Sequence, residues 1–102
     1  MVDEKIKRRM RDTIKAAKEE LGRPKELYRV ININDPECPF HLERFRKSEE
    51  KGSEVLKIRI VLDRVSDEDI YLCKEYKMPG KIFTKLIMCK KLGQREFETI
   101  EV

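Results

Sequence analysis

At 102 residues, the chain has the length of one ordinary domain, with enough residues for a single hydrophobic core and too few for two. Charged residues make up 43% of the chain and nearly balance at a net charge of +4, so composition does not require a nucleic-acid partner. No apolar run reaches the roughly 18 residues that a membrane span needs, and the N-terminus lacks the apolar centre of a signal peptide. We therefore expect a cytoplasmic protein that does not bind membranes.

The first 22 residues carry the pattern of an amphipathic helix. Their apolar residues recur at spacings of three and four, and Gly22 and Pro24 supply the signal that ends the helix. We predict that residues 1–22 are a helical extension of a single α/β domain that spans residues 27–102. The apolar stripe of this helix needs cover, either from the chain's own sheet or from a second copy in a homo-oligomer, and the sequence leaves both open.

The next segment predicts a strand followed by a helix. Residues 27–33 are apolar and β-branched and run into a turn, which is typical of a strand. Pro39 suits a first helical turn, because its missing N–H would have no partner there. The spacing of the apolar residues after it predicts a helix over residues 39–50, with Cys38 as its N-cap residue.

The second half of the chain predicts one further helix among strands. Residues 56–62 alternate with period two, which predicts a strand with one buried face and one largely solvated face. Ser66 opens a sequence like a capping box before a helix over residues 67–77. Residues 81–92 fit either a strand or a helix, and the residues around Gly93 favour a terminal hairpin.

These elements together predict an α/β protein, more exactly an α+β two-layer sandwich. The N-terminal helix would be followed by the order βαβαββ, with a four-stranded mixed sheet and the helices on one face. The abundance of charge beside only three Asn and Gln residues in the chain is typical of heat-adapted proteins, so we expect a thermophilic source.

The chain contains three cysteines and a single histidine, which is the ligand count of a Cys3His zinc site. Cys38 and His41 have workable local spacing, but Cys73 and Cys89 stand alone in apolar stretches. Because free cysteine is among the most often buried residue types, we expect Cys73 and Cys89 in the core. A structural zinc site made of all four residues is the less favoured alternative, and we expect reduced thiols and no cofactor.

Cys38 is the strongest candidate for chemistry. As an N-cap residue, its sulfur would face unpaired backbone N–H groups and the positive end of the helix dipole, which favour the reactive thiolate. His41 would lie in the first helical turn, from which it could exchange a proton with Cys38. For Cys38 a plain capping role is the alternative, and for His41 a solvated position on the helix is the favoured interpretation.

The segment from Cys38 onward resembles the TusA/SirA-like sulfur carrier family. It reads CPFHLERFRK and continues with KGSEVLKI at residues 51–58. These residues are similar to the family's Cys-Pro-x-Pro loop, its basic helix and the start of its second strand. His41 stands where the family has its second proline. The resemblance covers about residues 27–102 and leaves the N-terminal helix aside.

Membership of this family implies a sulfur relay protein rather than a classical enzyme. Cys38 would accept a sulfane sulfur as a persulfide from a donor protein and pass it to an acceptor protein. The resemblance implies that Pro39 holds the turn. It also implies that Arg44 and Lys47 add positive potential near the anionic persulfide. We expect His41, which departs from the family motif, to act as a modulator of the cysteine from its place beside it.

The alternative function is a non-catalytic module that binds a protein or a nucleic acid through a basic surface. We expect the N-terminal helix to carry that surface, through the residues Lys5, Lys7, Arg8, Arg9 and Arg11. Acidic residues lie close to this cluster in the sequence, so a merely solvated face is the favoured interpretation of it.

Overall fold

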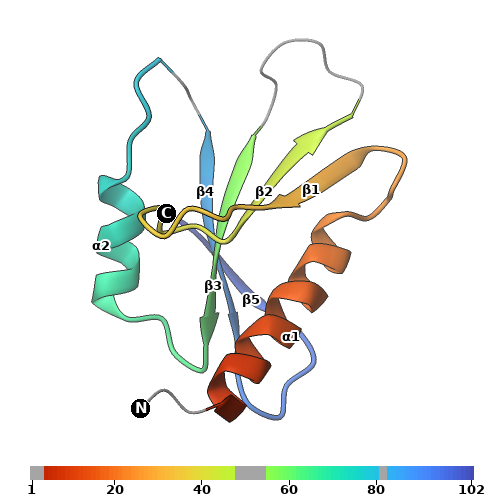
Figure 1. Ribbon diagram of the computed structural model, residues 1–102, viewed down its shortest axis with the longest axis vertical. Helices are drawn as coiled ribbons and strands as arrows, with labels where there is room; N and C mark the ends of the chain where they lie inside the picture. Colours follow the sequence, from red (N-terminus) through yellow and green to blue (C-terminus); the bar gives the residue numbers. More distant parts are fainter. Residues whose placement is uncertain (1–3, 48–54, 81–82) are drawn as a thin grey trace.

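The computed structural model describes residues 4–47, 55–80 and 83–102. The elements in chain order are α1 (Glu4–Leu21), β1 (Tyr28–Asn32), β2 (Leu42–Arg46), β3 (Leu56–Leu62), α2 (Asp67–Glu75), β4 (Thr84–Lys90) and β5 (Glu98–Glu101) (Figure 1). This confirms the expected α+β class. Within the described part of the chain, no helix is long and apolar enough to cross a membrane.

The strands form one five-stranded mixed sheet in the order β1-β2-β3-β4-β5. Strands β3 and β4 run parallel, with α2 as the connection between them, and every other neighbouring pair is antiparallel. The predicted four-stranded sheet and the order βαβαββ are therefore wrong. Three strands follow α1 before the second helix begins, because the segment after Pro39 adds a strand instead of a helix.

The helix predicted over residues 39–50 is wrong in its described part, and residues 48–50 lie outside the described residues. The segment forms β2, which pairs with β1 on one side and with β3 on the other. Apolar residues in so short a run fit a helix or a strand equally well. Strand pairing on both sides satisfies the backbone hydrogen bonds of the segment and decides between the two.

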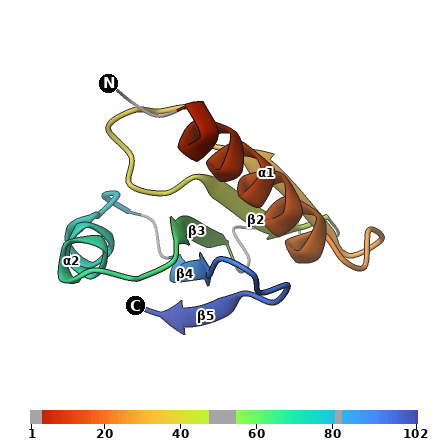
Figure 2. The ribbon, with the colours of Figure 1, turned by 90° about the horizontal axis from the view of Figure 1, so that it is seen from below.

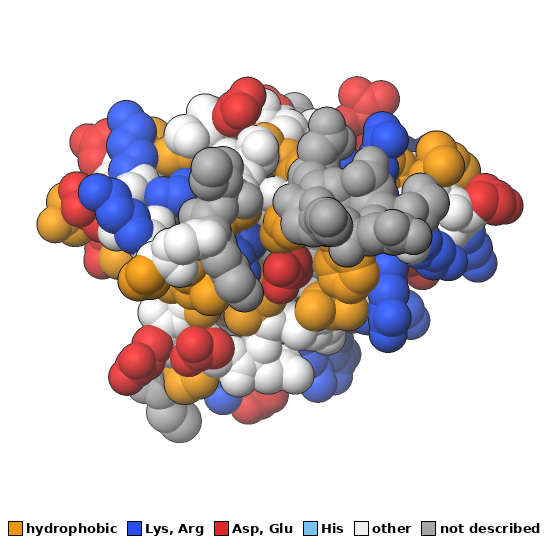
Figure 3. All heavy atoms as spheres, turned by 90° about the horizontal axis from the view of Figure 1, so that it is seen from above, with side chains coloured by type: hydrophobic (Ala, Val, Ile, Leu, Met, Phe, Trp, Pro, Cys, Tyr) orange, Lys and Arg blue, Asp and Glu red, His pale blue; other side chains and the backbone are white. Residues whose placement is uncertain are grey.

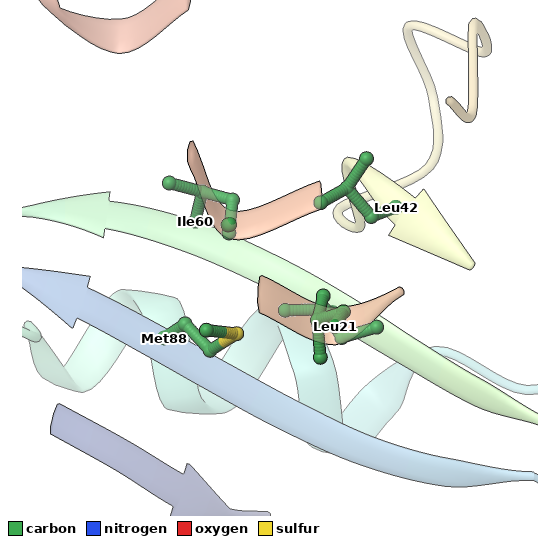
Figure 4. Close-up of a cluster of buried hydrophobic side chains, with 6 residues drawn as sticks. Leu21, Leu42, Ile60 and Met88 are labelled. Atoms are coloured by element: carbon green, nitrogen blue, oxygen red, sulfur yellow. The ribbon is translucent and has the colours of Figure 1, made fainter. Parts of the chain in front are cut away.

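The two helices cover opposite faces of the sheet, so the prediction that both lie on one face is wrong (Figure 2). The core under α1 contains Ala17, Leu21, Leu42, Ile58, Ile60 and Met88 (Figure 4). The core under α2 contains Phe40, Val61, Cys73, Ile87 and Cys89. Strands β3 and β4 supply residues to both, as alternate residues of a strand must when both faces are covered. The expected solvated face of β3 is accordingly buried, and even Lys57 is only 7% exposed.

Helix α1 packs on the chain's own sheet. Its residues Ala17 and Leu21 are buried, and Met10 and Ile14 pack against the same core. The apolar stripe predicted from the sequence is therefore covered within one copy of the chain over most of its length. Only the first turn departs from this, because Ile6 is 56% exposed.

The later elements agree well with the sequence. Helix α2 begins with a complete capping box between Ser66 and Asp69, as predicted, and ends at Glu75 instead of Lys77. The segment left open as strand or helix forms β4, with residues 81–82 outside the described part. Strands β4 and β5 pair antiparallel, which confirms the terminal hairpin.

Asp63, just after β3, joins three parts of the fold. Its backbone has a φ of 67°, the left-handed region that aspartate tolerates better than most residues. Both carboxylate oxygens accept hydrogen bonds from Arg9 at 2.7 Å, and one of them also accepts from the Leu92 N–H at 2.9 Å. The side chain thus ties α1 to the turn between β4 and β5.

We expect Asp63→Asn to make the free energy of unfolding depend less on pH in the acidic range. Hydrogen bonding to Arg9 lowers the pKa of Asp63 from 3.8 to about 2, so the folded state binds fewer protons than the unfolded state. The stabilisation is complete above the ordinary pKa and is lost as the pH falls towards about 2. Urea unfolding measured at several pH values between about pH 5 and about pH 2 gives the free energy of unfolding at each pH. Its slope against pH should be shallower for the variant than for the wild type. An unchanged slope, or an equal change in Asp67→Asn on the surface of α2, would contradict this role.

Candidate functional site

A tight turn places Cys38 between β1 and β2. The carbonyl oxygen of Asp35 accepts a hydrogen bond from the Cys38 N–H at 3.1 Å, and the Asp35 carboxylate accepts one from the Glu37 N–H at 3.0 Å. Pro36 holds the second position of the turn, which its fixed φ suits. No helix begins at Cys38, so its predicted role as an N-cap residue is wrong, and a helix dipole does not act on its sulfur.

The turn lies beside α2 (Figure 1). A cleft of about 400 Å³ is lined by residues of both. The residues that line the cleft are Pro36, Glu37, Cys38, Pro39, Arg59, Leu72, Glu75 and Tyr76. Cys38 is half-buried there, whereas Cys73 and Cys89 are buried. Cys38 is therefore the one cysteine of this chain that a reagent can approach from a cleft.

Tyr76, immediately after α2, is a hydrogen-bond partner of the Cys38 side chain. This hydrogen bond, followed by burial, raises the pKa of the Tyr76 hydroxyl. The ring is held by edge-on contacts, with its centroid 5.5 Å from Phe40 and 6.0 Å from Phe83. These aromatic contacts fix the position of the hydroxyl next to the thiol.

Arg59 on β3 connects the turn to α2. Its Nη1 donates to the Pro39 carbonyl oxygen at 2.8 Å, and its Nε donates to Asp69 Oδ1 at 2.9 Å. Burial opposes ionisation of Asp69, but hydrogen bonds from Ser66 and Arg59 outweigh it and lower the pKa of that carboxyl group. The result is a fixed cation at the wall of the cleft that contains Cys38.

His41 has a structural role that the sequence did not indicate. The backbone N–H of His41 donates to the Ile58 carbonyl oxygen at 2.8 Å, and Leu42, the next residue, is aligned with Ile58 as well. Two consecutive residues therefore face a single residue of β3, as in a β-bulge. His41 Nδ1 then accepts the Ile60 N–H at 2.8 Å. Burial, followed by the charge of Arg59, lowers the pKa of His41. The predicted solvated helix position is therefore wrong, and Nδ1 is bonded to the backbone of β3.

The structure does not bring Arg44 and Lys47 to Cys38, so their predicted role beside the sulfur is wrong. Arg44 lies on the α1 face of the sheet, with its guanidinium 4.1 Å from the centroid of the Tyr28 ring. Lys47 follows the far end of β2. A helix would have kept both within three turns of Cys38, but a strand advances about 3.3 Å per residue and separates them.

Cys73 and Cys89 occupy the core under α2, as predicted, with 0% and 1% of their surfaces exposed. Burial raises the pKa of both thiols, which favours the unreactive protonated form. Over residues 4–47, 55–80 and 83–102, no three His, Cys, Asp or Glu side chains are grouped so that they could hold a metal ion. The four-residue zinc alternative therefore has no support in the geometry.

The basic cluster of the N-terminal helix does not form one surface. Lys5, Arg8 and Arg9 border a cleft of about 360 Å³ beside the turn between β4 and β5. Lys7 and Arg11 border a different hollow, next to Ile6 and Met10. Arg9 is moreover paired with Asp63. The expected single binding surface on α1 is thus divided between two sides of the helix.

Two residues of the site, Arg59 and Tyr76, were missed as functional residues by sequence reasoning. Arg59 belonged to the supposedly solvated face of its strand, and Tyr76 lay near the end of the helix predicted over residues 67–77. The one sequence feature that pointed to Arg59 was the capping-box carboxylate of Asp69, because a carboxylate that becomes buried needs a basic partner. Comparison of the chain with protein families, curated proteins and solved structures found no match.

Proposed function

We propose that the protein is a small thiol-based sulfur carrier in which Cys38 holds the transferred sulfur as a persulfide. The observation that carries the proposal is the setting of Cys38, a half-buried thiol at a cleft with the Tyr76 hydroxyl as its hydrogen-bond partner. The Tyr76 hydroxyl and the Arg59 guanidinium line the same cleft as the thiol, and the thiolate is the nucleophilic form of a cysteine. The helix dipole has no part in this, and Arg59 takes the place first given to Arg44 and Lys47.

The chemical step is a transfer between two sulfur atoms. The Cys38 thiolate attacks the terminal sulfur of a donor persulfide, a new S–S bond forms on Cys38, and the donor's S–S bond breaks. The bonding electron pair leaves with the donor's inner sulfur as a thiolate, so the step needs no oxidant or reductant. The reverse chemistry on an acceptor thiolate restores the Cys38 thiolate. Donor and acceptor are proteins of the reducing cytoplasm, where a free thiol persists.

The cleft can hold a small transferred group. Its lining includes the Tyr76 hydroxyl and the Arg59 guanidinium, both engaged with the protein's own atoms, and the carboxylates of Glu37 and Glu75. A terminal sulfur atom needs few polar groups around it, which suits a carrier. Membership of the TusA/SirA-like family remains a prediction from residues 38–58 of the sequence, and the carrier function proposed here does not depend on it.

Intact mass spectrometry tests the proposal. After incubation with a small-molecule persulfide donor, the wild type is expected to gain the mass of one sulfur atom, and a reductant should remove it. Cys38→Ser should gain nothing, while Cys73→Ala, which removes a buried thiol, should gain sulfur like the wild type. Tyr76→Phe should react several-fold more slowly, because the thiolate loses a hydrogen-bond donor. Labelling that persists in Cys38→Ser would refute the carrier proposal.

A further inference from the structure

The open end of the β1–β2 hairpin gathers positive charge. Lys47 donates its N–H to the Leu27 carbonyl oxygen at 3.0 Å, which brings the end of β2 against the turn that precedes β1. The basic end, as we call this region, consists of Arg23, Lys25, Arg29, Arg44, Arg46 and Lys47. Arg44 and Arg46 lie on the face of the sheet that α1 covers, and Arg29 lies on the opposite face of the same edge. In Figure 3, blue side chains gather at the right of the molecule, on the side of β1 and β2 in Figure 1.

This region accounts for the positive charge of the whole chain. Residues 22–29 and 44–47 contain six basic residues and one acidic residue, Glu26, which gives them a net charge of +5. The complete chain has a net charge of +4, so all the remaining residues together carry −1. Positive and negative charges nearly cancel over the whole chain, but the positive charge is concentrated in this one region.

An aromatic ring lies within this positive region. The guanidinium carbon of Arg44 is 4.1 Å from the centroid of the Tyr28 ring, and that of Arg46 is 5.9 Å from it. The Arg44 guanidinium is steadied by a hydrogen bond to the Leu21 carbonyl oxygen at 3.5 Å. Tyr28 itself is partly exposed. Guanidinium planes and aromatic rings are the surfaces on which unpaired nucleic-acid bases stack.

The other basic hollow, between α1 and the turn after β4, is a weaker candidate. Arg9 there is paired with Asp63 at 2.7 Å, and Lys91 is paired with Glu98 at 3.1 Å. Asp12 also lines this hollow. Carboxylates therefore offset several of its positive charges, whereas residues 22–29 and 44–47 contain a single acidic residue, Glu26.

We propose that the basic end binds single-stranded nucleic acid. The exposed basic side chains Arg23, Lys25, Arg29 and Lys47 contact the phosphates. An unpaired base stacks on the Tyr28–Arg44 pair. A duplex keeps its bases paired and stacked on one another, so it has only the phosphate contacts to offer. This inference does not rest on the sulfur carrier proposal, because Cys38 lies before the start of β2 and the basic end lies at its other end.

Fluorescence anisotropy with a labelled single-stranded RNA of mixed sequence tests this inference. Binding is expected at low salt and should weaken as salt increases, with a slope of log K against log salt of about −0.7 for each phosphate contacted. Lys25→Glu with Lys47→Glu should weaken binding about tenfold or more. The matched control, Lys74→Glu with Lys77→Glu on the opposite side of the molecule, makes the same change in net charge and should bind nearly as the wild type does.

Tyr28→Leu tests the stacking role, because leucine keeps an apolar side chain at residue 28 and removes the ring. It should weaken binding of single-stranded RNA and leave duplex binding unchanged. The proposal is overturned if the wild type binds no RNA at low salt, or if both double variants lose affinity equally. It is also overturned if a duplex of the same length, or polyglutamate, binds as tightly as the single strand.

Discussion

Phe40→Ala is expected to lower the free energy of unfolding by about 3–5 kcal/mol, the usual cost of removing a buried aromatic ring. Phe40 is only 1% exposed and makes edge-on ring contacts with Tyr76 at 5.5 Å and with Phe83 at 6.3 Å. It therefore joins the loop before β2 to the end of α2 and to the start of β4. The substitution leaves a cavity where these three segments meet.

Chemical denaturation followed by circular dichroism measures this loss. Phe40→Leu keeps most of the volume and should recover a large part of the stability. Tyr71→Ala is the matched control, because Tyr71 is an aromatic residue of α2 that is 62% exposed and its truncation should change the free energy by less than about 0.5 kcal/mol. A Phe40→Ala protein as stable as this control would show that the ring cluster does not hold the loop to α2.

His41→Leu is expected to cost about 1–3 kcal/mol, because the Ile60 N–H would lose its acceptor in a buried strand. The bond to His41 Nδ1 is 2.8 Å long, and Ile60 is 1% exposed. His41→Asn keeps a side-chain oxygen near the position of Nδ1 and should retain more of the stability than His41→Leu. Equal stability of the two variants would contradict the role of this hydrogen bond.

The hydrogen bond that His41 Nδ1 accepts from the Ile60 N–H makes the free energy of unfolding depend on pH. Burial and Arg59 lower the pKa of His41 below its ordinary value of 6.5, so the unfolded state takes up a proton at a higher pH than the folded state. The contribution of His41 is complete above about pH 6.5 and is lost as the pH falls below it. The free energy of unfolding of the wild type should decrease between about pH 7 and about pH 5, and that of His41→Asn should decrease less.

The parts of the fold that sequence predicted well are those with several signals in agreement. Helix α1 combined a long apolar period with Gly22 and Pro24 at its end, and α2 combined a capping box with acidic residues in its first turn. The β4–β5 hairpin followed from Gly93, whose φ of 82° suits a turn. In each case local chemistry and tertiary structure favour the same conformation.

The segment after Cys38 could not be predicted correctly from its own residues. Its conformation depends on two strand partners that are distant in the sequence, and Pro39 is as compatible with an irregular loop as with a first helical turn. The bulge at His41 was equally hidden, because it arises from the alignment of β2 with Ile58 and Ile60. Because residues 39–50 were predicted as a helix, Arg44 and Lys47 were expected close to Cys38, whereas strand β2 carries them away from it.

The candidate site could be predicted only in part for the same reason. Cys38 was found because a cysteine before a proline is conspicuous in the sequence, whereas Arg59 and Tyr76 reach it from β3 and from the end of α2. Neither residue carries a local mark of function. Their approach to Cys38 depends on which face of the sheet α2 covers, and the prediction placed both helices on one face.

The position of α1 has a consequence for how the chain folds during synthesis. This helix is synthesised before the strands that it packs on, and its buried residues pack on Ile58, Ile60 and Met88. These contacts span most of the sequence, so they form late and make folding slow compared with that of a helical bundle. The helix therefore exposes its apolar stripe until β4 has been made, and a chain that stops before Met88 never acquires the surface that covers it.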